Sequence, residues 1–332
     1  MEVEKIVLDR QRNVTLTAYI QATGGAFSRI PCRPAVLILP GGGYQYCSDR
    51  ESDPVAFAFL KAGFQTFILR YSVGRNAVWP NPLEDYESAM ELIRGKADEW
   101  NLCPDKIAVI GFSAGGHLAA AAATMSRNRP DAAILGYAVT GEDVKGCNPT
   151  APGAVAAVDK NTCPCFVFAT ASDEIVPVEN SIEMIRALAR EGISFESHIY
   201  GYGPHGFSTC DSAVQDLSGS ICDRAPDWVE DSIGWLKEYF GDFGDGVFAP
   251  PKFGKYINGD REPVMNIHCT VGKLMGNEQV RRLLPELAAQ ADAMGDNSGL
   301  TKMTLSGLLG FQSVPKAELE ALDQKLRQIS NE

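Results

Sequence analysis

The chain has 332 residues, a formal net charge of −12 and a hydrophobic content of 45%. This composition is that of a globular protein, and its acidic balance argues against nucleic acid or an anionic membrane as a partner, because both repel an acidic surface. The longest apolar run, near LAAAAATM, is too short to cross a bilayer, and the first residues, MEVEKIVLDR, lack the apolar segment of a signal peptide. We therefore expect a cytoplasmic protein without a nucleic-acid or membrane partner.

Strand-like and helix-like segments alternate over the first 240 residues. Residues 14–20 alternate between apolar and polar side chains and predict an edge strand, whereas most later strand segments are apolar throughout. Later strands are predicted within residues 35–39, 65–72, 106–113, 131–139, 165–172 and 194–201, and helices within 53–64, 82–100, 114–125, 180–192 and 227–240.

This alternation predicts an α/β fold with a mostly parallel central sheet that helices cover on both faces. In such sheets the functional site forms at the carboxyl ends of the strands. The loops that follow strands are therefore the candidates for chemistry, and they read PGGGY, GFSAGG, TASDEIVP and YGPHGF.

The amino-acid composition of the sequence changes after residue 241. Residues 1–241 are predicted to form the α/β domain, residues 242–262, rich in glycine, proline and aspartate, a linker, and residues 263–332 a small helical appendage. The last predicted helix starts near Pro315 and carries leucines on one stripe. Because such stripes must be buried, we expect the appendage to contact a second copy of the chain, giving a homo-oligomer, or to form a rim over the site.

Nine cysteines are scattered along the chain, and their odd number together with the missing export signal predicts reduced thiols. Cys163 and Cys165 form a C-x-C pair, but no second cluster of ligands matches it. No metal site is therefore predicted.

Ser113 stands in GFSAG, between an apolar strand and an alanine-rich helix. A nucleophile at such a turn sits on a strained backbone, and the glycines two positions to either side avoid clashes. The helix that follows points its positive end at the place where negative charge would develop. Tight packing of the helix on the sheet is the alternative reading, but the strand–turn–helix context favours Ser113 as a nucleophile.

A serine hydroxyl needs a base, and the four histidines differ in their positions. His117 lies in the first turns of the helix after Ser113, where we expect a structural hydrogen bond. His198 lies inside a predicted strand, and His268 lies in the appendage. His205 lies in a glycine- and proline-rich loop directly after the last strand, which favours it as the general base.

The base in turn needs a carboxylate that fixes its tautomer and stabilises the imidazolium. Asp173 is the first carboxylate past the strand CFVFATA, and Glu174 is its competitor. Asp211 is too close to His205 in the sequence to reach the far ring nitrogen easily. Asp173 is therefore predicted to be the acid.

The tetrahedral intermediate of acyl transfer also needs hydrogen-bond donors for its oxyanion. The loop PGGGY exposes backbone N–H groups after an early strand, and phosphate binding is the rival interpretation of such a loop. Neither the G-x-G-x-x-G spacing nor a P-loop lysine is present, however. We therefore predict an oxyanion hole formed by Gly42, Gly43 and Ala114.

Four motifs together, PGGGY, GFSAGGHLAA, ASDEIVPVENS and GPHGF, resemble those of α/β-hydrolase esterases related to acetyl xylan esterases and hormone-sensitive-lipase-like carboxylesterases. The order serine, aspartate, histidine is also typical of that fold. The resemblance implies an α/β-hydrolase fold and a two-step acyl transfer: Ser113 is acylated, an alcohol leaves, and water deacylates the enzyme with His205 as base. It implies no metal and no organic cofactor.

Two departures refine the resemblance. Pro40 stands where many relatives have histidine, which points to the acetyl xylan esterase-like branch. The segment 140–164 is short, although relatives often carry a lid insertion there. A short segment suggests an open site suited to a soluble or polymer-derived substrate with a small acyl group.

We therefore expect a serine esterase that removes acetyl groups from sugars, with xylo-oligosaccharides as the predicted substrate. Tyr44, Trp79 and Phe207 are candidate sugar-facing aromatics, and each is equally a candidate core residue. A general short-chain carboxylesterase or a peptidase of the same fold is the alternative, because nothing in the sequence separates ester from amide bonds. An inactive hydrolase fold used only for binding is disfavoured because all four site motifs are intact.

Overall fold

The computed structural model describes residues 1–295, 299–312 and 314–331. The chain divides into two compact units, Met1–Lys255 and Tyr256–Glu332, and the division lies inside the predicted linker, residues 242–262. Each unit contains its own cluster of buried apolar side chains.

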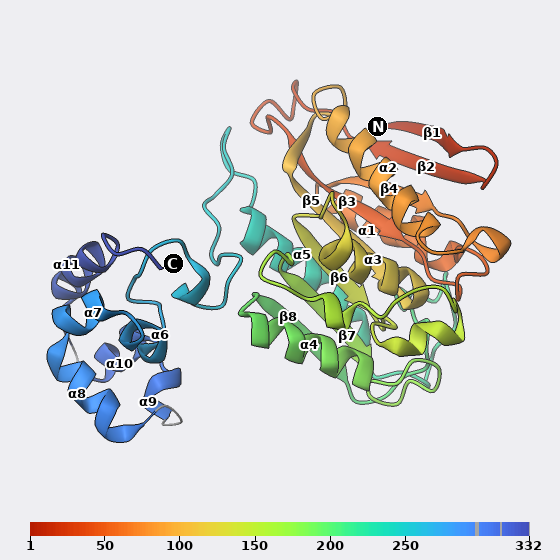
Figure 1. The fold of residues 1–332 in the computed structure, drawn as a ribbon. Coiled ribbons are helices and arrows are strands. Elements are labelled where there is room, and N and C mark those ends of the chain that lie inside the picture. The colour runs from red at the N-terminus through yellow and green to blue at the C-terminus, as the bar shows by residue number, and fades with distance from the viewer. Residues whose placement is uncertain (296–298, 313, 332) are drawn as a thin grey trace. The chain divides into compact units, whose positions relative to one another are not determined.

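The first unit is built on an eight-stranded sheet with the strand order β1-β2-β4-β3-β5-β6-β7-β8 (Figure 1). β2 pairs antiparallel with both β1 and β4, and the strands from β4 to β8 run parallel. The strands are β1 Glu2–Asp9, β2 Val14–Ile20, β3 Arg33–Leu39, β4 Gln65–Arg70, β5 Leu102–Phe112, β6 Ala132–Gly136, β7 Cys165–Thr170 and β8 Phe195–Tyr200.

The edge of this sheet differs from the sequence prediction. β1 is the outermost strand, and β2, predicted to be the edge, lies inside the sheet and is mostly buried. β1 leaves most of its side chains exposed or half-buried, and it carries Glu2, Glu4 and Lys5. Charged side chains suit an edge strand because they discourage pairing with another chain. The prediction was wrong because the polar start of the chain showed no apolar strand pattern.

Helices cover both faces of the sheet, as the alternating pattern predicts (Figure 1). Side chains from α1 and α5 share one apolar cluster with Ile110 of β5. The neighbouring Gly111 points the other way, because a Cβ atom there would lie 2.8 Å from the Cβ atom of Ala119 in α3. The helices of this unit are α1 Asp53–Lys61, α2 Asn81–Gly95, α3 Ser113–Met125, α4 Glu179–Glu191 and α5 Trp228–Phe240, with short 3₁₀ turns η1 Asp49–Glu51, η2 Gly74–Asn76, η3 Glu142–Gly146, η4 Val155–Ala157 and η5 Ala225–Asp227.

A disulfide joins Cys32 to Cys103 in the first unit. The prediction that all cysteines are reduced is therefore wrong for this pair. Parallel pairing of β3 with β5 sets Arg33 opposite Leu102, which brings the adjacent cysteines together although 71 positions separate them. Sequence spacing does not reveal such a pairing, because it follows from strand register.

The second unit is helical, and its core is formed largely by leucine, valine, methionine and alanine. Two helices, α7 and α8, meet at Pro285, which cannot donate a backbone hydrogen bond within a helix. Among the described residues, no helix in either unit is both long and apolar enough to span a membrane. The elements of the second unit are η6 Gly259–Arg261, α6 Val271–Met275, α7 Glu278–Leu283, α8 Pro285–Met294, α9 Gly299–Lys302, α10 Leu305–Phe311 and α11 Lys316–Leu326.

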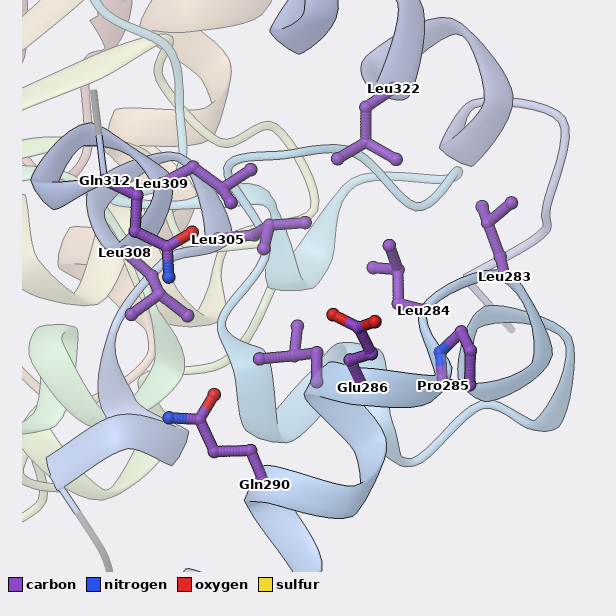
Figure 2. Close-up of a pocket in the computed structure, with 11 residues that line it drawn as sticks. Leu283, Leu284, Pro285, Glu286, Gln290, Leu305, Leu308, Leu309, Gln312 and Leu322 are labelled. Atoms are coloured by element: carbon purple, nitrogen blue, oxygen red, sulfur yellow. The ribbon is translucent and has the colours of Figure 1, made fainter. Parts of the chain in front are cut away.

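A cavity of about 370 Å³ lies within the second unit (Figure 2). Leucine side chains from α7, α8, α10 and α11 make up most of its wall, with Glu286, Gln290 and Gln312 as polar neighbours. Among the described residues of this unit, those that form the wall include no serine, histidine or cysteine.

Residues 242–255 belong to the first unit rather than to a free linker. Phe253 stacks on Tyr239 of α5, with 5.4 Å between the ring centroids, and the carbonyl of Lys255 accepts a 2.8 Å hydrogen bond from the backbone N–H of Ser194.

We expect a fragment of residues 1–255 to unfold cooperatively and to be more stable than a fragment of residues 1–241, by about 2 kcal/mol, because the shorter fragment loses the packing of Phe253 on Tyr239. Urea denaturation of both fragments measures the difference, and equal stabilities would contradict the assignment.

Candidate active site

Ser113 lies at the junction of β5 and α3, and its backbone is in the left-handed region at a φ of 54°. Two glycines permit this turn. A Cβ atom on Gly111 would lie 2.1 Å from the carbonyl oxygen of Gly115, and a Cβ atom on Gly115 would lie 2.1 Å from the carbonyl oxygen of Leu39. Strand, turn and helix therefore approach too closely for any larger residue, and the half-buried Ser113 is left at the carboxyl end of the sheet.

His205 lies in the loop after β8, and its ring joins the two other predicted residues. Its Nε2 atom is 2.8 Å from Ser113 Oγ, and its Nδ1 atom is 2.7 Å from Asp173 Oδ2. A carboxylate only accepts hydrogen bonds, so Nδ1 carries the proton and Nε2 is free to accept one from the serine hydroxyl. This is the tautomer that a general base requires.

Asp173 follows β7, and its side chain is fully buried. Its second oxygen, Oδ1, accepts 2.9 Å hydrogen bonds from the backbone N–H groups of Ile175 and Val176. The carboxylate is thus held with Oδ2 directed at the imidazole. Glu174, its competitor in the sequence, is exposed.

The glycine loop after β3 lies against the nucleophile. A Cβ atom on Gly41 would lie 3.1 Å from the Cβ atom of Ser113. Within residues 1–295, no hydrogen bond occupies the N–H of Gly42 or Gly43, and Ala114 is in the first turn of α3, where N–H groups lack acceptors inside the helix. These three donors, predicted as an oxyanion hole, are therefore available to a substrate oxygen.

His117 is fully buried and plays a structural part, as expected from its position. Its Nδ1 atom is 2.6 Å from the hydroxyl of Tyr44, and its Nε2 atom is 2.8 Å from the carbonyl oxygen of Pro152. Burial, which penalises the charged ring, lowers its pKa to about 4. His117 therefore stays neutral and links α3 to the glycine loop and to the segment after β6.

Two of the three predicted sugar-facing aromatics are core residues. Tyr44 and Phe207 have no exposed surface, so neither ring can stack on a substrate, and the prediction is wrong for both. Phe207 packs on Tyr137 with 4.7 Å between the ring centroids, while Tyr44 bonds to His117. Both follow site residues closely, but the chain turns their side chains inward. Trp79 is half-buried beside His117 and remains a predicted substrate contact.

Sequence reasoning missed two buried side chains next to the site, Glu51 and Tyr137. Glu51 accepts hydrogen bonds from the N–H of Gly41 and from the hydroxyl of Tyr137, each at 2.7 Å. Tyr137 follows β6, and its ring lies edge-on to the His205 ring at 5.0 Å. Its place at the end of a parallel strand is a usable signal, whereas Glu51 sits in the polar run CSDRESD, where nothing marks it.

A cavity of about 390 Å³ opens beside the imidazole. Its wall combines polar and apolar groups. The lining residues are Ser172, Glu174, Ile175, Gly203, Pro204, His205 and Ser220.

A model of the BD-FAE family matches residues 28–144, which include Ser113 but neither Asp173 nor His205. The chain is 30% identical over 234 residues to an acetylxylan esterase of Xylanibacter ruminicola, covering 61% of this chain and 48% of that protein. It is 32% identical over 207 residues to endo-1,4-beta-xylanase B of Butyrivibrio fibrisolvens, covering 53% of this chain and 33% of that protein. The chain thus spans a third to about half the length of these curated relatives.

Among solved structures, the chain is 41% identical to an α/β hydrolase enzyme from a Medee basin deep-sea metagenome library. The TM-score is 0.68, and the match covers 72% of this chain and 97% of the other. The chain belongs to the α/β-hydrolase family. The predicted α/β-hydrolase fold is thereby confirmed.

Acid is expected to destabilise this α/β-hydrolase through His117. Its pKa is about 4 in the folded chain against an ordinary 6.5, so as the pH falls through this window the unfolded state takes up a proton that the folded state does not. The free energy of unfolding should therefore fall by about 2 kcal/mol from pH 7 to pH 5 through this residue alone. Urea denaturation at both pH values measures this. Between pH 7 and pH 5, the free energy of unfolding of His117→Gln should fall by about 2 kcal/mol less than that of the wild type. Equal losses in the two proteins would contradict the prediction.

Proposed function

We propose that the chain hydrolyses carboxylic esters, with Ser113 as nucleophile, His205 as general base and Asp173 as the group that orients the base. The observation that carries this proposal is the unbroken hydrogen-bonded line from Asp173 Oδ2 through both ring nitrogens of His205 to Ser113 Oγ. Each partner comes from a different strand end, so local sequence does not explain their meeting. Membership of the α/β-hydrolase family and the similarity to an acetylxylan esterase support the same reaction.

The reaction starts with transfer of the Ser113 hydroxyl proton to His205 Nε2 while Oγ bonds to the ester carbonyl carbon. The carbonyl electron pair moves to its oxygen, and Asp173 stabilises the positive charge on the ring. The tetrahedral intermediate collapses as the C–O bond to the alcohol breaks and the imidazolium protonates the leaving oxygen. Water, deprotonated by His205, then attacks the acyl-enzyme and releases the acid and the free serine.

The negative oxygen of each tetrahedral intermediate needs donors that are already in place. Gly42 and Gly43 adopt φ values of 125° and 60°, which suit glycine and turn the loop past the nucleophile. Ala114 adds an N–H from the first turn of α3, where the helix dipole favours negative charge. In this proposal the three N–H groups form the oxyanion hole.

For the substrate, we propose acetyl esters of carbohydrates, with xylo-oligosaccharides as the class to test first. Hydroxyl and carboxylate groups of Ser172, Ser220 and Glu174 line the cavity beside His205, and such groups suit the hydroxyls of a sugar. Two of the chain's relatives are an acetylxylan esterase and a xylanase. Trp79, half-buried near the start of α3, is the proposed aromatic contact to the sugar.

Ser113→Ala should abolish ester hydrolysis, because no other group supplies the attacking oxygen. We expect kcat/KM for p-nitrophenyl acetate to fall by roughly 10⁴-fold or more. The melting temperature should stay within about 2 °C of the wild type, because only a half-buried hydroxyl is lost. Spectrophotometric rates and a thermal melt measure the two effects. Residual activity near the wild-type level would refute the mechanism.

Acetate release from acetylated xylo-oligosaccharides tests the substrate class. We expect kcat/KM for these sugars to exceed that for p-nitrophenyl butyrate, and amide analogues to react far more slowly. Quantified acetate alongside a chain-length series of p-nitrophenyl esters makes the comparison. A preference for longer acyl chains with no acetate released from the sugars would favour a general carboxylesterase instead.

A further inference from the structure

Glu51 is a buried carboxylate that the acyl-transfer steps above do not use. Only 4% of the residue is exposed, and no lysine or arginine forms an ion pair with it in the part of the chain that the structure describes. Each carboxylate oxygen instead accepts one 2.7 Å hydrogen bond, Oε2 from the N–H of Gly41 and Oε1 from the hydroxyl of Tyr137. A buried acid held by two neutral donors beside an active site calls for an explanation.

The direction of each Tyr137 hydrogen bond follows from the chemistry of its partner. The backbone N–H of Ser208 can only donate, so the 3.1 Å bond between it and the Tyr137 oxygen makes that oxygen an acceptor. The phenol proton is then directed to Glu51. Both bonds that reach Glu51 are therefore donated to it, which is the arrangement that an ionised carboxylate needs. Burial raises the pKa of Glu51, and these two bonds oppose that effect.

The line from Ser208 through Tyr137 and Glu51 to Gly41 connects two loops that are far apart in the sequence. Gly41 immediately precedes the proposed oxyanion donors, and a Cβ atom there would touch both the Ser113 side chain and Glu51 Oε2. Ser208 lies three positions after His205, and its hydroxyl also donates a 2.6 Å hydrogen bond to the carbonyl oxygen next to Glu51, that of Arg50. The η1 turn thus holds the glycine loop and the histidine loop at once.

Charged groups face His205 from several elements. Asp173, after β7, bonds directly to its Nδ1, and Glu174 lines the same cavity. From η1, Glu51 lies near enough that positive charge on His205 and on Arg50 opposes the rise that burial causes in its pKa. Of these groups, Asp173 and Glu51 are buried carboxylates, and a buried charge acts more strongly than an exposed one.

We propose that Glu51 is a positioning residue that, as a carboxylate, fixes the glycine loop against the histidine loop and favours the imidazolium formed on His205 during acyl transfer. The inference rests on the proposed function. Tyr137 carries the geometric link to the histidine loop, whereas Glu51 carries both the link to Gly41 and the charge. Removal of each group therefore has a different kinetic signature.

The test compares Glu51→Gln, Tyr137→Phe and Ser113→Ala with the wild type, using p-nitrophenyl acetate over a range of pH. Glu51→Gln keeps the size of the side chain but removes its charge, and an amide cannot accept both bonds. We expect its kcat to fall by about 10- to 100-fold while KM stays nearly constant, because the donors and the base lose their alignment. The acidic limb of kcat/KM should also move to lower pH, because the protonated ring loses a stabilising negative charge. Tyr137→Phe should lower kcat without moving that limb.

Glu87→Gln serves as the matched control. Glu87 in α2 is also a buried glutamate, and it lies outside the site. It accepts hydrogen bonds from the Ser126 hydroxyl and the N–H of Arg127, and unlike Glu51 it also pairs with the Arg127 guanidinium. We expect it to keep the wild-type kcat and pH profile. The control separates loss of any buried carboxylate from loss of this one.

The outcomes are distinguishable. Wild-type kcat in Glu51→Gln overturns the proposal, and a lower kcat with an unmoved acidic limb overturns its electrostatic part by reducing Glu51 to a structural residue. Where Glu51→Gln does not fold, the kcat of Tyr137→Phe tests the positioning part of the inference. A wild-type kcat overturns that part, and a reduced kcat at an unchanged melting temperature supports it. Activity that survives in Ser113→Ala refutes the proposed function itself, whereas an inactive Ser113→Ala beside an unaffected Glu51→Gln refutes only the role of Glu51.

Discussion

The site depends on the close contact between β5, α3 and the glycine loop around Ser113. Gly111 and Gly115 allow backbone atoms of these three segments to meet at distances that a side chain would prevent. The chain is thereby forced through a left-handed turn at Ser113. This turn leaves the serine oxygen at the carboxyl end of the sheet instead of in the core. Such strain persists only where the surroundings determine it fully, and here buried strands and a buried helix do so.

The same kind of strain recurs around the nucleophile. Tyr44, Tyr137 and Ser208 also have positive φ values although none is glycine. All three are buried, and all three make hydrogen bonds through side chain or backbone that secure a site loop. Strained backbone and buried polar contacts thus occur together, which fits a site whose loops are held in position before substrate arrives. The buried carboxylate of Glu51 extends this arrangement from the glycine loop to the histidine loop.

The two units of the chain differ in what their cores support. In the first, aromatic side chains from α5 and the strands pack behind the site, and Trp228 both stacks on Phe168 and donates a hydrogen bond to the carbonyl oxygen of Ser208. The core there is continuous with the chemistry. In the second unit, short helices enclose a leucine-lined cavity with a few polar residues at its wall (Figure 2). The chemistry proposed for this protein therefore belongs to the first unit.

Local patterns in the sequence predicted the alternation of strands and helices and the turn at Ser113. They also pointed to His205 and Asp173, because both residues directly follow predicted strands. Each of these signals is carried by neighbouring residues. Strand order and side-chain direction were decided only by the tertiary structure. The charged β1 became the edge, Cys32 met Cys103 through strand register, and the rings of Tyr44 and Phe207 turned inward although they follow site residues. Glu51 reached Gly41 and Tyr137 for the same reason: its partners come from distant segments, and contacts of that kind form only when the sheet has brought the strand ends together.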